Sequence, residues 1–118
     1  MFKFMIVFHQ PDDLEQFENS YNDLLALVER MPDITRRQVI NVTGSPLGAS
    51  PYYRILEVYY PDKATLDKSL LSEAGQEAGG QIGTFPAGTF EMIFAEVYEE
   101  EGGRTPTSTP SKTTGDTD

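Results

Sequence analysis

The sequence predicts one small α+β domain with the element order strand, helix, strand, strand, helix, strand. Three observations lead to this prediction. Residues 2–8 form an aromatic, β-branched run before a stretch of helical periodicity, residues 52–60 read as a long strand, and residues 89–98 form a last apolar run. At 118 residues the chain has the length of a single domain.

The first part of the chain predicts a buried strand and an amphipathic helix. Residues 2–8 (FKFMIVF) end at a polar turn that contains proline, as a buried strand does. Asp12 or Asp13 can cap the helix, because Glu15 and Gln16 follow at capping-box spacing. Apolar residues then recur on one helical face at Leu14, Phe17, Tyr21, Leu24, Leu25, Val28 and Met31. The proline that follows is expected to end the helix.

The middle of the chain predicts two strands joined by a turn. Residues 34–43 alternate weakly and carry Arg36 and Arg37, which suits an edge strand protected by charge. Residues 44–51 (GSPLGASP) have the composition of a turn. Residues 52–60 (YYRILEVYY) have the strongest β propensity in the chain.

The second helix is predicted to be weaker than the first. Asp62 can cap it, and apolar residues follow at four-residue spacing at Leu66, Leu70, Ala74 and Ala78. Its far end contains Gly75, Gly79 and Gly80. Because glycine disfavours helix, this end is expected to be weak or the helix to be broken in two. Residues 83–88 then read as a loop, and residues 89–98 as the last strand.

Residues 99–118 differ in composition from the rest of the chain. They contain Thr, Ser, Pro, Gly and charged residues, with no apolar side chain. Such a segment buries too little surface to offset the entropy of ordering. The sequence therefore predicts a domain over residues 1–98 and a disordered acidic tail over residues 99–118.

Composition narrows the function classes. The net charge of −10, from nine Lys and Arg against nineteen Asp and Glu, argues against binding to nucleic acid. The absence of cysteine excludes disulfides and thiolate catalysis, and a single histidine argues against a multi-His metal site. Neither a metal nor a cofactor is predicted. No apolar run approaches the length of a membrane span or has the form of a signal peptide, so a cytoplasmic location is expected.

The sheet is predicted to be apolar on both faces. Residues 52–60 and 89–98 carry apolar side chains at odd and even positions alike, whereas the two helices can cover only one face. The second face must be covered by self-association or by a ligand. Two such sheets packed face to face would form a barrel-like homodimer that encloses a cavity.

Three segments carry a resemblance to a known family. They read FKFMIVFHQPDDLEQFENSY, LALVERMPDITRRQVINVTGSPLGASPYYRILEVYYPD and LLSEAGQEAGGQIGTFPAG. In these segments the chain resembles the EthD-like family of the dimeric α+β barrel superfamily over about residues 1–98. The resemblance implies a ferredoxin-like βαββαβ protomer with a four-stranded antiparallel sheet, a homodimer and a small-molecule cavity beside the sheet.

One position departs from the family pattern. Many members carry His-x-Pro-Leu near the end of the first helix, whereas this chain has Leu24 and Ala26 in place of the His and Pro and retains Leu27. Chemistry that depends on that histidine in relatives is therefore not predicted here. Enzymes on the same architecture include small monooxygenases, lactone isomerases and haem-handling proteins.

Glu57 and His9 are the candidate catalytic residues. Glu57 lies mid-strand between Leu56 and Val58, where a carboxyl group is costly to bury and a protonated one could shuttle protons in an isomerase, cyclase or dehydratase. The alternative is a structural Glu57, paired with an arginine (Arg36, Arg37 or Arg54) or hydrated at a dimer seam. His9 ends the first strand and could act as a base or be an ordinary surface residue, and no pattern around it suggests haem ligation.

Several aromatic residues could line an apolar pocket or simply form core. They are Tyr21, Tyr53, Tyr59, Phe85 and Phe90. The leading hypothesis is a homodimer whose cavity binds a small hydrophobic metabolite, with cofactor-free acid–base chemistry by Glu57 helped by His9 or a tyrosine. The alternatives are a non-catalytic accessory protein of a degradation pathway and a cofactor-independent monooxygenase.

Overall fold

The computed structural model describes residues 1–102, so the predicted tail lies outside the described residues apart from 99–102. The elements in chain order are β1 (Phe2–His9), α1 (Leu14–Val28), β2 (Arg36–Asn41), β3 (Tyr52–Tyr60), α2 (Lys63–Leu71), α3 (Glu73–Ile82) and β4 (Phe90–Glu96). The strands form one sheet in the order β2-β3-β1-β4, and each neighbouring pair is antiparallel. This is the predicted ferredoxin-like arrangement, with the second helix in two pieces. Within residues 1–102 no helix is long and apolar enough to cross a membrane.

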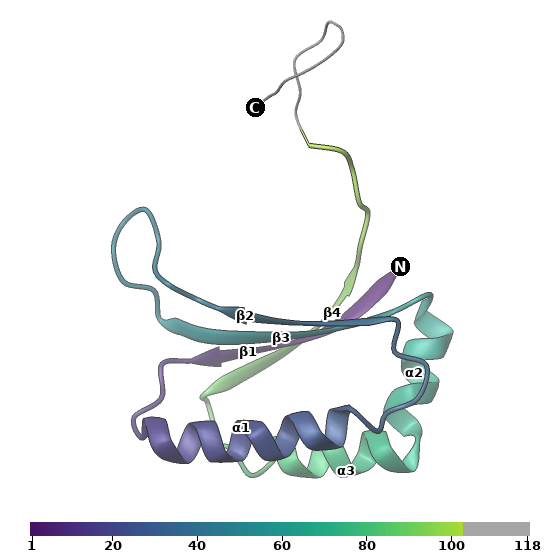
Figure 1. Ribbon diagram of the computed structural model, residues 1–118, viewed down its shortest axis with the longest axis horizontal. Helices are drawn as coiled ribbons and strands as arrows, with labels where there is room; N and C mark the ends of the chain where they lie inside the picture. The colour runs from purple at the N-terminus through teal and green to yellow at the C-terminus, as the bar shows by residue number, and fades with distance from the viewer. Residues whose placement is uncertain (103–118) are drawn as a thin grey trace, which may run out of the picture.

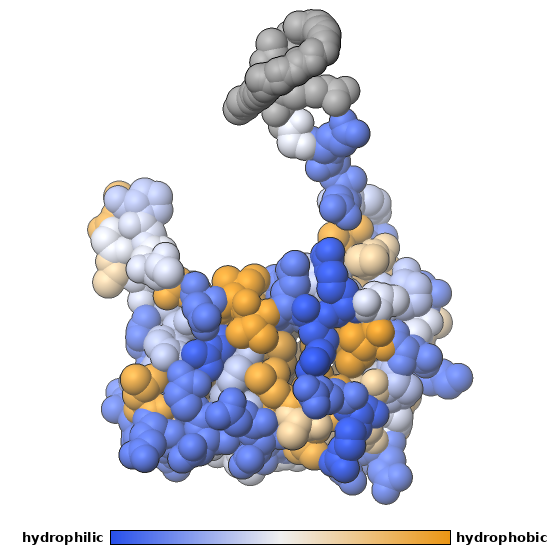
Figure 2. Space-filling view, in the orientation of Figure 1, coloured by the Kyte–Doolittle hydropathy of each residue, from blue (hydrophilic) through white to orange (hydrophobic). Residues whose placement is uncertain are grey.

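The molecule has two layers (Figure 1). All three helices lie against one face of the sheet, and no helix within residues 1–102 covers the other face, which we call the open face. The loop between β2 and β3 and the chain that follows β4 both project on the open side (Figure 1). In Figure 2, hydrophilic side chains dominate over α1, and apolar side chains appear at the level of the sheet.

The start of α1 confirms the predicted cap, and its end corrects the predicted boundary. The Asp13 carboxylate accepts a hydrogen bond from the backbone N–H of Gln16 at 3.1 Å. The helix ends at Val28, earlier than Met31, because the chain tightens into a turn in which the N–H of Met31 donates to the carbonyl of Val28 at 3.0 Å. Asp33 then adopts a left-handed conformation with φ of 67°. Met31 is buried all the same, so the apolar stripe extends beyond the helix.

The second helix is broken at Ser72. This residue has extended ψ of 164°, and its Oγ accepts from the N–H of Gly75 at 3.0 Å to cap α3. A Cβ on Gly75 would collide with the backbone of Ser69 and Leu70. The predicted break is confirmed, but the role of this glycine is to let α2 and α3 approach closely rather than to weaken the helix.

Side chains alternate between the two faces of the central strands. Residues of β1 and β3 that face the helices form the core with residues of α1 and the α2–α3 pair: Phe4, Ile6, Phe8, Leu56, Val58, Tyr60, Phe17, Tyr21, Leu24, Val28, Leu66, Ala78 and Ile82. Residues on the open face pair across the strands, with Lys3 opposite Tyr59 and Met5 opposite Glu57. The alternation in β3 is therefore the one that the sequence predicts from Leu56 to Tyr60.

Several strand boundaries differ from prediction. The first strand ends at His9, as expected, but the second is shorter than 34–43 and the last ends at Glu96 rather than at residue 98. The second strand is an edge strand, as predicted. Pairing between β1 and β3 is irregular near Tyr53, because Phe8 pairs with Arg54 and His9 with Tyr52. An extra residue of this kind re-aims side chains, and it takes Tyr53 out of the predicted alternation.

Candidate functional site

A cavity of about 290 Å³ lies between the sheet and the helices. Its inner wall consists of apolar side chains from both layers, all buried except the partly buried Leu70: Phe4, Ile6, Leu56, Val58, Val28, Met31, Leu70, Ala78 and Ile82. The sequence creates this space because α3 presents small residues, Gly75, Ala78 and Gly79, toward the cavity. A helix face without long side chains leaves volume over the strands beneath it.

The exposed rim of this cavity comes from α3 and β4. Gln76 and Gly79 stand on the helix side, and Met92 and Phe94 on the strand side are 56% and 63% exposed. Gln76 is the one polar residue among the described lining, and its Nε2 donates to the carbonyl of Leu71 at 3.0 Å. The cavity is therefore an apolar site with a single side-chain amide at its mouth.

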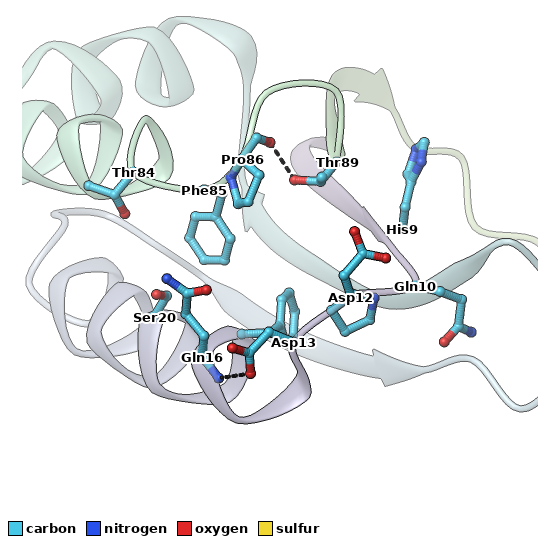
Figure 3. Close-up of a pocket in the computed structure, with 12 residues that line it drawn as sticks. His9, Gln10, Asp12, Asp13, Gln16, Ser20, Thr84, Phe85, Pro86 and Thr89 are labelled. Carbon is cyan, nitrogen blue, oxygen red and sulfur yellow. Dashed lines mark hydrogen bonds between the residues drawn. The ribbon is translucent and has the colours of Figure 1, made fainter.

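A second pocket of about 130 Å³ lies at the end of β1 and the start of α1 (Figure 3). Asp12, Asp13 and Gln16 line it from one side, and Pro86 and Thr89 of the loop between α3 and β4 line it from the other. The hydroxyl of Thr89 donates to the carbonyl of Pro86, which closes the loop on itself. We call this site the polar pocket.

Glu57 lies on the open face and is paired. Its Oε2 accepts from the Lys3 ammonium at 3.0 Å and its Oε1 from the Tyr59 hydroxyl at 2.6 Å. The Arg36 guanidinium lies 4.3 Å from the centre of the Tyr59 ring. Glu57 is only 6% exposed, so Lys3 balances a buried charge. The partner is Lys3 and not one of the three arginines considered from the sequence.

His9 forms a separate pair at the end of the sheet. Its Nε2 lies 2.8 Å from Oε2 of Glu91, and its ring meets the Tyr52 ring edge-on at 5.5 Å. It also lines the polar pocket, in which its ring points away from the labelled residues of α1 (Figure 3). The two candidate catalytic residues therefore have different partners in two different places.

The predicted ligand-binding aromatics divide into two groups. Tyr59 belongs to the open face, whereas Tyr21, Phe85 and Phe90 belong to the helix side, where the rings of Phe17 and Tyr21 stack at 5.7 Å. Tyr53 joins the second group, since its hydroxyl donates to Glu18 on α1 at 3.0 Å.

An arginine fixes one end of this helix-side group. The Arg54 guanidinium donates to both carboxylate oxygens of Glu18, at 2.7 and 2.9 Å, and lies 4.6 Å from the centre of the Tyr21 ring. The Arg54 hydrogen bonds hold the pKa of Glu18 below its usual value. Burial raises the pKa of Tyr21 to about 12, and its hydroxyl has no hydrogen-bond partner within the described chain.

None of the residues predicted from the sequence as catalytic or ligand-binding lines the cavity between the sheet and the helices. Its rim residues, Gln76, Gly79, Met92 and Phe94, were not candidates, although glycines at four-residue spacing are a signal for a helix face with missing side chains. Leu24, where relatives often keep a histidine, is fully buried in the core. Within residues 1–102 no three acidic or histidine side chains gather in a way that could hold a metal ion.

Comparison with known proteins places the chain in a structural context. No family model matches the sequence. An uncharacterized 11.0 kDa protein in the thcB-thcC intergenic region of Rhodococcus erythropolis is 26% identical over 100 residues, which cover 81% of this chain and 94% of that protein. An ethyl tert-butyl ether D (EthD) family protein from Bacillus halodurans is 26% identical, with a TM-score of 0.79 over 83% of this chain and 99% of that chain. The resemblance to the EthD family is confirmed.

More distant structures share the ferredoxin-like fold. A dimeric protein of unknown function from Jannaschia is 18% identical, with a TM-score of 0.59 over 82% of this chain and 100% of that chain. SnoaB, a cofactor-independent oxygenase from Streptomyces nogalater, is 12% identical, with a TM-score of 0.60 over 84% of this chain and 94% of that chain. At these identities the likeness concerns the fold alone.

Proposed function

We propose that this EthD-like protein binds a compact apolar molecule in the cavity between its sheet and α3. The observation that carries the proposal is a space of about 290 Å³ whose described lining contains no ionisable side chain. An apolar cavity of about 150 Å³ stays dry and admits benzene. A cavity about twice that size has room for a two-ring hydrocarbon.

The arrangement favours binding over acid–base catalysis. Leu56 and Val58 line the cavity, whereas Glu57 between them points to the open face. A general acid or base must come within hydrogen-bond reach of its substrate or act through one water. The sheet separates Glu57 from a ligand in the cavity, so the accessory role is preferred to cofactor-free acid–base chemistry.

We also propose that the protein acts as a homodimer through its open face. Ile93 is 40% exposed there, and its neighbours Met5 and Ile55 are half-buried. A second sheet would remove these side chains from water, which is the main favourable contribution to protein association. The Jannaschia protein with this fold is described as dimeric, which supports a homodimer.

A binding titration with a matched pair of variants tests the cavity. Gly79 lines the rim and Gly80 does not, yet a Cβ at either position meets open space. Replacing either glycine by leucine raises the helix propensity by the same amount. The two single variants therefore differ in whether the new side chain lies at the cavity or away from it. With naphthalene as the probe, followed by its own fluorescence, the wild type and Gly80→Leu should bind alike, and Gly79→Leu should bind at least tenfold more weakly. Equal binding by all three proteins, or no saturable binding by the wild type, would refute the proposal.

Cofactor-independent oxygenation is the second candidate, favoured by the apolar lining and by the fold shared with SnoaB. An electron-rich substrate such as 1,4-dihydroxynaphthalene would itself supply the electrons: one oxygen atom of O2 would enter the ring to give 2-hydroxy-1,4-naphthoquinone, and the other would leave as water. Oxygen uptake by the wild type that exceeds uptake by Gly79→Leu would support this role. Equal uptake would leave binding alone as the function.

A further inference from the structure

The cavity and the polar pocket lie in the same layer and are consecutive along β1. Ile6 lines the cavity and His9 lines the polar pocket. Phe8 stands between them on the helix-facing side and is only 1% exposed. Along this strand a single buried ring separates the two spaces.

The same order recurs along the chain from α3 to β4. Ile82 and Met92 line the cavity, and Thr89 lines the polar pocket. Phe85 and Phe90 lie between these positions in the sequence. Phe8 in β1 and Phe90 in β4 thus lie between residues that line the two spaces, whereas Phe85 follows Thr84, which already lines the polar pocket.

These three phenylalanines form one contact group, which we call the aromatic partition (Phe8, Phe85 and Phe90). The centre of the Phe85 ring lies 5.1 Å from that of Phe8 and 6.3 Å from that of Phe90. It also meets the Phe17 ring of α1 edge-on at 5.9 Å. Phe85 therefore joins the partition to the helix layer and closes the gap between the strands and α1.

Phe85 differs from the other two members in its backbone. Phe8 and Phe90 belong to hydrogen-bonded strands, whereas Phe85 lies on the loop after α3. In Figure 3 its ring points inward among Gln16, Ser20 and Pro86, and the side chain is 6% exposed. It is also the one member of the partition that lines the polar pocket.

We infer that Phe85, which lines the polar pocket but not the cavity, is a specificity-determining residue that keeps the two spaces apart and so excludes long molecules with a polar end. Without its ring, the apolar cavity would continue into a pocket that offers the carboxylate of Asp12, the amide of Gln16 and the hydroxyl of Thr89. The joined site would accept an alkyl chain with a terminal hydroxyl group. The inference rests on the proposed function, because it concerns the same cavity.

A series of linear 1-alkanols in competition with naphthalene measures the length of the site. Affinity should rise roughly fourfold per carbon until the cavity is full, and then level off. In Phe85→Ala the chain length at which affinity levels off should increase by at least two carbons. Phe2→Ala is the matched control, since Phe2 packs against the core but lines neither space. The same limit in wild type and Phe85→Ala would overturn the inference.

Crystals of the Phe85 variants under xenon pressure give a readout that does not require alkanol binding. Phe85→Leu, a smaller change, serves if Phe85→Ala does not fold. In the variant we expect xenon atoms in the cavity, in the polar pocket and in the space left by the Phe85 ring. In the wild type we expect none in the space that the ring fills. Collapse of Phe17 or Phe90 into the space, with the two cavities still separate, overturns the inference even if naphthalene binds. Failure of naphthalene to bind the wild type would instead refute the proposed function.

Discussion

The two faces of the sheet place neighbouring residues of the same strand in different surroundings. On the helix side, Leu56 and Val58 are almost fully buried and border a cavity without charge. On the open side, Glu57 is buried as well, but through a pair with Lys3 and a hydrogen bond from Tyr59. One face borders an apolar cavity, in which we propose that a ligand binds, and the other pairs its charges and keeps apolar side chains that we propose a second copy covers.

This difference bears on the prediction that Glu57 is catalytic, which stays a prediction. A buried carboxyl group suggests chemistry when its neighbours are apolar. Here the neighbours in sequence are apolar, but the neighbours in space are an ammonium and a phenol. Buried, paired carboxylates also occur in structural networks.

Met92 and Ile93 provide the most sensitive way to separate the faces, because they are consecutive in β4 and point to opposite sides. Ile93→Asp should weaken dimerisation at least a hundredfold, since it places a carboxylate between two apolar sheets. Met92→Asp should leave the dimer intact and weaken naphthalene binding at least tenfold. Sedimentation velocity and fluorescence titration measure the two effects. Loss of the dimer in Met92→Asp but not in Ile93→Asp would invert the assignment of the faces.

Truncation of Leu56 and of Ile55 compares the packing of the two faces. Leu56 is fully buried and Ile55 is half-buried. Leu56→Ala should lower the free energy of unfolding by about 2–5 kcal/mol, and Ile55→Ala by less, because part of its side chain is already in water before the partner binds. Urea denaturation at low protein concentration measures both. Equal losses in the two variants would argue against the asymmetry.

Removal of Lys3 tests whether the open face holds a charge pair. The Lys3 and Glu57 side chains are 18% and 7% exposed. Lys3→Met should destabilise the protein by about 3 kcal/mol, because it leaves a buried carboxylate without its cation. The double variant Lys3→Met with Glu57→Leu should recover most of that loss, as replacement of both charges by apolar groups often does. Thermal denaturation of the single and double variants tests this, and no recovery in the double variant would contradict it.

Tyr21 lies on the helix side of the sheet, and its replacement by phenylalanine should have the smallest effect on stability. Its buried hydroxyl has no partner within residues 1–102, so Tyr21→Phe should raise stability by about 1 kcal/mol. Because burial raises the pKa of Tyr21 to about 12, the folded wild type keeps its proton longer than the unfolded chain. Wild-type stability should therefore fall as the pH rises from about 10 to 12, and Tyr21→Phe should lack that part of the slope. Parallel slopes in the two proteins would show that the phenol ionises equally in both states.

The element order and the alternation of the central strands followed from the sequence, because both depend on local periodicity. The partner of Glu57 did not, because Lys3 meets it only through the register of β1 against β3. The place of Tyr53 was mispredicted for a similar reason, since the irregular pairing at Phe8 and His9 re-aims it toward α1. The cavity depends on small residues of α3 that lie over strands distant in the sequence, a relation that no local pattern contains.

The number of ligands bound per dimer tests the central claim most directly. The sequence predicted a cavity enclosed between two sheets, which would hold one ligand on the symmetry axis, and that cavity stays a prediction. The described cavity lies within each protomer, on the helix side of the sheet. Calorimetric titration of naphthalene, with the oligomeric state fixed by sedimentation, should give two sites per dimer, both lost in Gly79→Leu. One site per dimer, unchanged in Gly79→Leu, would contradict the account.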